Sequence, residues 1–145
     1  MRKASVAGLI LAMGWCMTLQ ADGLEGAKEG LYEISMATQM PGMPMDMGPQ
    51  TIQQCMKKDD FKDPQRLLQE EGAVEECQVT DQKMGSQNLT FSLNCPAEHM
   101  TGKGDYTFSA TGYSGVVVMT VQGMEGGGPT TMTTKIQARY MGPCN

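Results

Sequence analysis

Four methionines gathered in one short stretch carry the side chains of this sequence best suited to binding a soft metal. Met40, Met43, Met45 and Met47 are separated only by proline, glycine and aspartate. Thioether sulfur suits Cu(I) and similar ions. Methionine also packs on irregular apolar surfaces, and the chain has 15 methionines in all, which favours a contact loop. We expect residues 40–47 to form a methionine-rich loop, with Cu(I) or Ag(I) binding as the alternative function.

The sequence contains few residues of the types and spacings that catalytic sites use. His99 is the single histidine, and no Gly-x-Ser-x-Gly or paired Cys/His arrangement accompanies it. Four glutamates between residues 70 and 76 form a charge run of the kind that covers a solvated surface. We therefore predict that the protein is not an enzyme, with no catalytic residues and no cofactor.

Four cysteines, at positions 55, 77, 95 and 144, follow the N-terminal segment that contains Cys16. An even number of cysteines in a small exported chain indicates a disulfide framework. Zinc is the competing interpretation, but the cysteines are widely spaced and one histidine is present. We therefore expect two disulfide bonds.

The segment between Cys77 and Cys95 has the pattern of a β-hairpin that the two cysteines close. Alternating residues on both sides of a turn at residues 84–87 predict two antiparallel strands. A register without a bulge places residue 79 opposite 93 and residue 81 opposite 91. The two cysteines then face each other on one side of the hairpin, as a cross-strand disulfide requires.

The pairing Cys77–Cys95 leaves Cys55 to pair with Cys144. Such a bridge would join the segment before the helix to the C-terminal end of the chain. Four cysteines permit two other connectivities, and the sequence leaves both of them open.

The remaining chain alternates between strands and turns, with one helix expected within residues 59–71. Residues 40–49, with three prolines and two glycines, are not expected to continue a strand. We predict a mainly β fold of about seven strands, as a curved antiparallel meander or partly open barrel with one short helix, stapled by disulfides. Outside the hairpin, strands are expected at residues 30–40, 51–55, 106–110, 116–121 and 132–140.

The N-terminal residues have the layout of a secretory signal. Arg2 and Lys3 precede an apolar run, and a small residue, Ala21, ends the segment. We expect a signal peptide at residues 1–21, a single β-rich domain at residues 22–145, and a periplasmic or secreted protein. The alternatives are a lipid anchor at Cys16 or an uncleaved apolar anchor; after cleavage no membrane span is expected.

The charge balance excludes some classes of partner. Losing Arg2 and Lys3 with the signal takes the formal net charge from −5 to −7. That balance argues against a nucleic-acid binder, which needs a basic face, and against adhesion to anionic lipid.

Several short motifs resemble those of a family of small exported bacterial proteins known as a domain of unknown function. They are Gly30-Leu31-Tyr32-Glu33, Met40-Pro41-Gly42-Met43-Pro44, Gln54-Cys55, the cysteines at 77 and 95, and Gly142-Pro143-Cys144. Tyr32 stands where the family is associated with tryptophan. The resemblance implies a periplasmic, largely β domain and no activity.

A non-enzymatic binding or envelope-interaction module is the function that these observations favour. Its partner would be an envelope protein or an apolar small molecule. For the latter, one face of a curled sheet offers Tyr106, Phe108, Met119 and Met132 as a lining.

Overall fold

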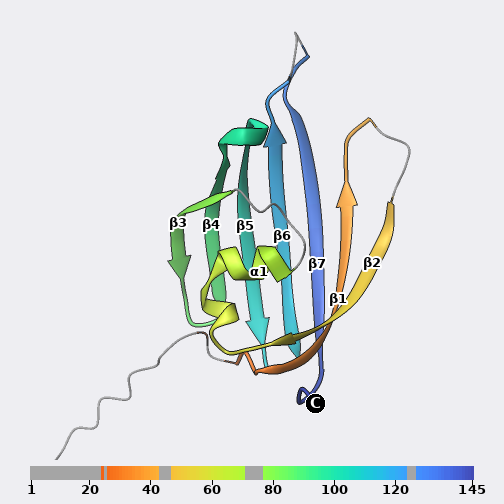
Figure 1. Ribbon diagram of the computed structural model, residues 1–145, viewed down its shortest axis with the longest axis vertical. Coiled ribbons are helices and arrows are strands. Elements are labelled where there is room, and N and C mark those ends of the chain that lie inside the picture. The colour runs from red at the N-terminus through yellow and green to blue at the C-terminus, as the bar shows by residue number, and fades with distance from the viewer. Residues whose placement is uncertain (1–23, 25, 43–46, 71–76, 124–126) are drawn as a thin grey trace, which may run out of the picture.

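A computed structural model describes residue 24 and residues 26–42, 47–70, 77–123 and 127–145, and it shows one open antiparallel sheet (Figure 1). The order of the seven strands is β2-β1-β7-β6-β5-β4-β3, and a single short α-helix, α1, accompanies them. The predicted fold class is thus confirmed: the protein is mainly β, antiparallel and not closed. The strands are β1 (Gly30–Gln39), β2 (Met47–Met56), β3 (Gln78–Met84), β4 (Asn88–Cys95), β5 (Met100–Ser109), β6 (Gly112–Val121) and β7 (Thr130–Gly142).

The last five strands form a meander, and its final strand, β7, lies beside the first strand of the sheet, β1. β7 pairs along its length with β1, from Leu31↔Gly142 to Gln39↔Thr133. The hairpin of β1 and β2 therefore extends the sheet beyond β7, and β2 becomes one edge while β3 becomes the other. Short connections explain the hairpins, since consecutive strands joined by tight turns pair antiparallel.

An aromatic cluster fills the inner face, which we define as the side of the sheet that bears Tyr32, Tyr106 and Phe108. Alternation along each strand sends these side chains to one side. The 3-10 helix η1 (Asp60–Lys62) adds Phe61, whose ring centroid lies 5.6 Å from that of Tyr32 and 5.7 Å from that of Phe108. All four residues are at most 1 % exposed. Helix α1 (Pro64–Glu70) lies in front of the same side of the sheet (Figure 1).

Glycines on the inner face leave room for these rings. A Cβ atom added at Gly104 of β5 would lie 2.3 Å from the ring of Phe91 on β4, and one at Gly115 would lie 2.6 Å from the ring of Tyr106. Phe91 and Gly104 are cross-strand partners, as are Tyr106 and Gly115. Each ring thus lies over the glycine opposite it, and a larger residue there would have to displace an aromatic side chain.

The helical segment confirms the short helix that the sequence predicts within residues 59–71. It divides into η1 and α1, and α1 begins at Pro64, which needs no N–H at a first helical position. Asp60 is buried and accepts hydrogen bonds from the Lys57 backbone N–H (2.7 Å) and from Arg66 Nη1 (3.1 Å). Leu67 and Leu68 of α1 are buried in the core.

Several details of the predicted strands are wrong. β5 and β6 begin at Met100 and Gly112, earlier than residues 106 and 116. The register of β3 and β4 contains a bulge between Thr80 and Lys83, so that residue 81 does not face residue 91. Asp81 has φ 51°, a left-handed conformation that aspartate tolerates better than most residues. β2 begins at Met47 and includes Pro49, within the stretch expected to exclude a strand; an edge strand beside an irregular register tolerates proline.

Two disulfides cross-link the chain, one within a hairpin and one between segments far apart in the sequence. Cys77 and Cys95, on the inner face, have Cα atoms 4.2 Å apart, and Cys55 and Cys144 have Cα atoms 5.8 Å apart. The first pair is buried, with 5 % and 1 % exposure, whereas both cysteines of the second are exposed. The second bridge fastens the edge strand β2 to the segment that follows β7.

The predicted signal peptide, its cleavage after Ala21 and the anchor alternatives at Cys16 lie outside the described residues. Within the part of the chain that the structure describes, neither α1 nor any other helix has the length and apolar character to cross a membrane.

Candidate functional site

The outer face of the sheet, opposite η1 and α1, carries the side chains that alternate with the core. It is rich in hydroxyl groups, since serine and threonine occupy most outward positions of β4, β5 and β6. Outward threonine and serine suit a solvated strand because they combine β propensity with polarity. The outward side chains of these three strands are Asn88, Thr90, Ser92, Asn94, Thr101, Lys103, Asp105, Thr107, Ser109, Ser114, Val116, Val118 and Thr120.

Val116 and Val118 interrupt the polar surface at the middle of β6. They are 40 % and 36 % exposed, although β6 has neighbours on both sides within the sheet. Val116 lies opposite Asp105 on β5 and Lys135 on β7, and Val118 lies opposite Lys103 on β5. The face therefore has an apolar centre bordered by lysine and aspartate.

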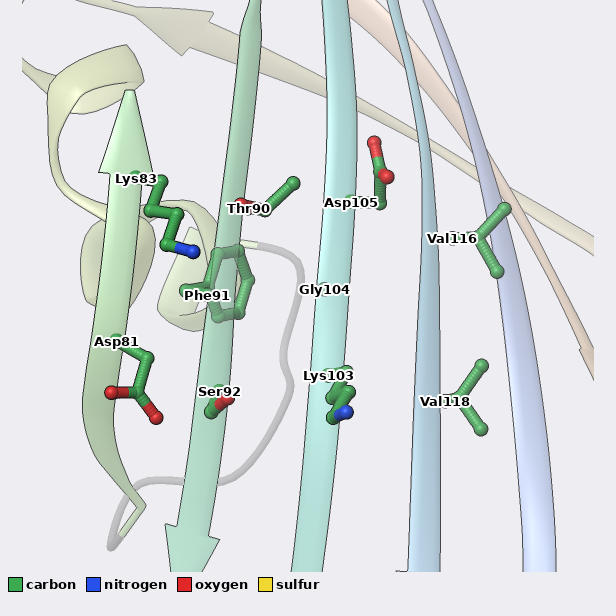
Figure 2. Close-up of a pocket in the computed structure, with 10 residues that line it drawn as sticks. All are labelled: Asp81, Lys83, Thr90, Phe91, Ser92, Lys103, Gly104, Asp105, Val116 and Val118. Atoms are coloured by element: carbon green, nitrogen blue, oxygen red, sulfur yellow. The ribbon is translucent and has the colours of Figure 1, made fainter. Parts of the chain in front are cut away.

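A shallow hollow of about 350 Å³ lies over these residues (Figure 2). It is lined by Asp81, Lys83, Thr90, Phe91, Ser92, Lys103, Gly104, Asp105, Val116 and Val118. A second hollow of about 410 Å³ shares Ser92, Lys103 and Val118 with it. The two hollows are thus contiguous and form a groove that runs from β3 to β6.

The groove presents charges that are free to meet a partner. The Lys103 ammonium and the Asp105 carboxylate make no ion pair or side-chain hydrogen bond with any other residue that the structure describes. The hydroxyls of Thr90 and Ser92 add donors and acceptors between the strands. The surface can therefore bind a ligand that combines an apolar group with groups of either charge.

A third hollow, of about 380 Å³, opens toward the other end of the outer face. Thr107, Ser109, Ser114 and Gln137 line it together with Arg139. The Arg139 guanidinium donates to Glu33 Oε1 at 3.0 Å, so its charge is already partnered. This end of the face is polar and has no counterpart of the exposed valines.

The sequence-predicted metal loop is only partly described. Met43 and Met45 lie outside the described residues, and for Met47 the structure describes the backbone alone. Met40 is half-buried after the end of β1. Binding of Cu(I) or Ag(I) by residues 40–47 therefore stays a prediction.

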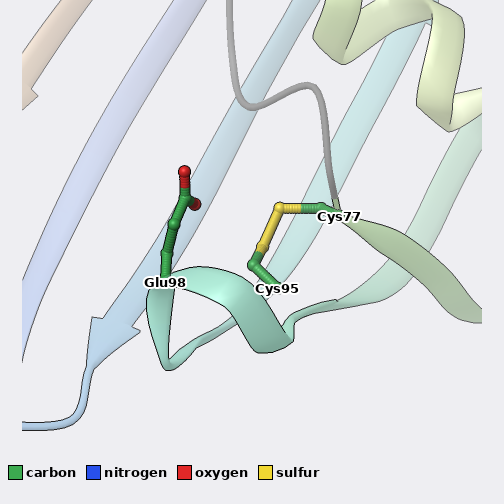
Figure 3. Close-up of side chains that lie close together, drawn as sticks. All are labelled: Cys77, Cys95 and Glu98. Atoms are coloured by element: carbon green, nitrogen blue, oxygen red, sulfur yellow. A yellow bond between two sulfur atoms is a disulfide. The ribbon is translucent and has the colours of Figure 1, made fainter.

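Cys77, Cys95 and Glu98 lie close together beside the short 3-10 helix η2 (Pro96–Glu98) (Figure 3). Their possible ligand atoms lie within 4.8 Å of one another. The two sulfurs are joined in a disulfide, however, and a metal ligand must be a thiolate. In this oxidised state the cluster offers a single carboxylate, and its role is structural.

The four residues expected to line an apolar binding site on the inner face pack against other residues of the protein instead. Tyr106 and Phe108 are buried in the aromatic cluster, and Met119 is 8 % exposed. Met132 is half-buried against the same core. None of the three hollows described above includes any of these four residues.

Tyr32 illustrates how the inner face treats a polar group. Its hydroxyl donates to the Lys28 carbonyl oxygen at 2.6 Å. Burial raises the pKa of the phenol above its ordinary value of 10.0, with a smaller contribution from Tyr140. Tyr32 faces the core and does not line the groove, so this shift reflects packing.

His99 is exposed at the end of η2, with φ 50°.

Sequence reasoning missed the exposed valines because an apolar run indicates a buried central strand. Val116 to Val121 does form the central part of β6, but nothing described covers its outer side. A usable signal was present in the neighbouring strands, whose outward positions are almost all polar. A central strand beside such neighbours must share their solvated face.

The family of proteins of unknown function DUF3617 matches residues 27–144. No curated protein and no solved structure matches the chain.

Proposed function

The chain belongs to the DUF3617 family, and from its geometry we propose that it is a non-enzymatic binding domain outside the cytoplasm, whose outer sheet face contacts a protein of the cell envelope. The family carries no assigned activity. The proposal therefore rests on the chemistry of the face itself.

The exposed valine pair is the observation that carries this proposal. Val116 and Val118 lie at the middle of a strand that has two neighbours, yet they are 40 % and 36 % exposed. Exposed apolar groups bordered by polar residues mark contact surfaces. Burying the exposed part of each valine side chain on association would stabilise the complex by about 1 to 2 kcal/mol.

A protein fits this surface better than a small molecule. A small-molecule site usually encloses most of its ligand. Here the valine floor is open to solvent, and the lining charges of both signs extend across three strands. A partner that places an apolar side chain over the valines and opposite charges against Lys103 and Asp105 would match the surface.

Export is supported by two separate features of the chain. The signal-like segment at residues 1–21 predicts secretion, and two disulfides are typical of an oxidising compartment. The expected place of the protein is the periplasm or the exterior of the cell.

Site-specific photo-crosslinking tests the proposed face. A photoreactive amino acid at position 118, introduced into the protein in living cells, should give a discrete crosslinked product with an envelope protein. The matched control is the same amino acid at Gln65, an exposed residue of α1 on the opposite side of the sheet.

A second variant ties the product to the surface chemistry. Lys103→Glu, combined with the photoreactive group at 118, should weaken the crosslink because it reverses one of the two free charges of the groove. Equal products from positions 118 and 65, or a product indifferent to Lys103→Glu, would contradict the proposal.

A further inference from the structure

The two edges of the sheet are built differently. At β3 the register breaks between Thr80 and Lys83; the charged Asp81 lies in the break, and Lys83 follows it. At β2 the pairing with β1 runs from Gln50 to Met56 without interruption, and the strand contains no Lys, Arg, Asp or Glu. Bulges and charges are the devices by which proteins prevent edge strands from pairing with other chains. The edge at β3 is thus protected along its middle, whereas β2 has such features, Pro49 and an irregular register, only at its start, and Gln50–Met56 is unprotected.

The unprotected edge is also held in a pairing conformation. β2 is fixed on one side by β1 and is fastened through Cys55 to Cys144. No described strand pairs with its other side. A strand that is already extended, paired with β1 and held by a disulfide loses little conformational entropy when a second strand pairs with it.

We propose that the free edge of β2 pairs antiparallel with β2 of a second copy of this chain, about a two-fold axis at Gln53. Residues that face each other in an antiparallel pair have side chains on the same side of the sheet. The two-fold axis must therefore lie midway between the two copies of one residue, which face each other. Gln53 is the centre of the uninterrupted stretch Gln50–Met56. The pairing joins the two sheets into one and leaves the groove over Val116 and Val118 open.

An identical strand meets no like-charge repulsion at this edge. Between Gln50 and Met56 no charged side chain of one copy meets one of the other. The nearest cations, Lys57 and Lys58, follow β2, and the two-fold axis sends those of the two copies to opposite ends. Along the strand they are separated by roughly 25 Å, well beyond the screening length of about 8 Å at physiological salt. Two Gln53 amides meet at the axis, where they can bond to each other.

Sedimentation equilibrium of the purified protein, at protomer concentrations from about 1 μM to about 1 mM, measures the expected monomer–dimer equilibrium. The test variant Thr51→Lys/Gln53→Lys places like charges at and beside the axis. It should raise the dimer dissociation constant at least about tenfold. Both replaced residues are exposed, and circular dichroism checks that the fold is intact.

The other edge provides a matched control. Gln78→Lys/Thr80→Lys makes the same two substitutions, at the same spacing, on two exposed residues of β3. This variant should dimerise like the wild type. Hydrogen exchange should also show that the dimer protects amides within residues 50–56 and leaves those of β3 unchanged.

Three outcomes would overturn the proposal. They are a wild type that stays monomeric over the whole range, equal weakening of the dimer in both lysine variants, and a dimer that persists in the Thr51→Lys/Gln53→Lys variant. A protein that stays monomeric but binds an extended foreign peptide at β2 would assign the edge to a different partner and would also refute self-pairing.

Discussion

The two faces of the sheet are made by the same strands and have opposite compositions. On the inner face, Tyr32, Tyr106 and Phe108 are at most 1 % exposed and close on Phe61 of η1. On the outer face, hydroxyls surround two valines that remain over one-third exposed. The covered side concentrates the apolar burial that stabilises the fold, while the uncovered side retains groups that are free to bind. Strand alternation thus separates the side that stabilises the fold from the side that we propose as a binding surface.

The space around the glycines also differs between the inner face and the edge strand β2. Inner-face glycines at 104 and 115 lie under aromatic rings, whereas a Cβ atom at Gly48, on the edge strand, would meet nothing within 4 Å. Substitutions on the two sides should therefore differ by amounts that equilibrium unfolding can measure.

Phe61→Ala should have the largest effect on stability. It removes the ring that contacts Tyr32, Phe108 and Tyr113, and the expected loss is about 3 to 5 kcal/mol in the free energy of unfolding. Val118→Ala, on the outer face, should cost less than about 1 kcal/mol. Urea unfolding followed by circular dichroism measures both, and similar losses would remove the distinction between the faces.

Gly104→Ala should come next, with a loss of about 1 to 3 kcal/mol from overpacking against Phe91. Gly48→Ala is the matched control, because its added methyl group enters open space, and its effect should stay within about 0.5 kcal/mol. The urea midpoints of the two variants provide the comparison. A neutral Gly104→Ala would show that the Phe91 ring can move without cost.

Tyr32→Phe should cost about 1 kcal/mol at pH 8 by removing the hydrogen bond to the Lys28 carbonyl oxygen. Burial raises the pKa of this phenol above 10.0 in the folded state. Above that pH the unfolded chain loses its proton first, so the stability contributed by Tyr32 is present below pH 10 and falls as pH rises.

The difference between wild type and Tyr32→Phe should therefore narrow at about pH 10.5. Urea midpoints at the two pH values measure this change. A difference that widens with pH would contradict burial as the cause of the shift.

Val116→Thr/Val118→Thr should have the smallest effect on the fold, with a change within about 1 kcal/mol, because threonine suits an outward strand position. The same variant should lose much of the crosslinking to an envelope protein, with the photoreactive group placed at the neighbouring Thr120. Unchanged crosslinking with unchanged stability would remove the valines from the binding surface.

Much of the fold could be predicted from local patterns. The alternation of Tyr32, Ile34 and Met36 marked β1, and the polar turn after Met84 marked the hairpin of β3 and β4. Hairpin geometry also brought Cys77 to Cys95, since both lie at the outer ends of neighbouring strands. These features depend on neighbours in the sequence, where residue type alone is informative.

Features that depend on distant contacts were not predictable. The pairing of β7 with β1 joins the two ends of the chain, and no local pattern specifies it. The bulge at Asp81 depends on a φ angle that aspartate permits but does not require. Phe61 belongs to a charged segment and becomes a core residue only because that segment packs against the sheet.

The sequence by itself indicated most of the strands, a framework of two disulfides and the division of strands into apolar and polar sides, because alternation and turn residues act locally. Only the tertiary structure decided which apolar side chains are covered. The residues of η1 and α1 pack on one side of the sheet, and nothing described covers Val116 and Val118 on the other. It also decided that β2 becomes an open edge, since the return of β7 to β1 fixes the order of the strands.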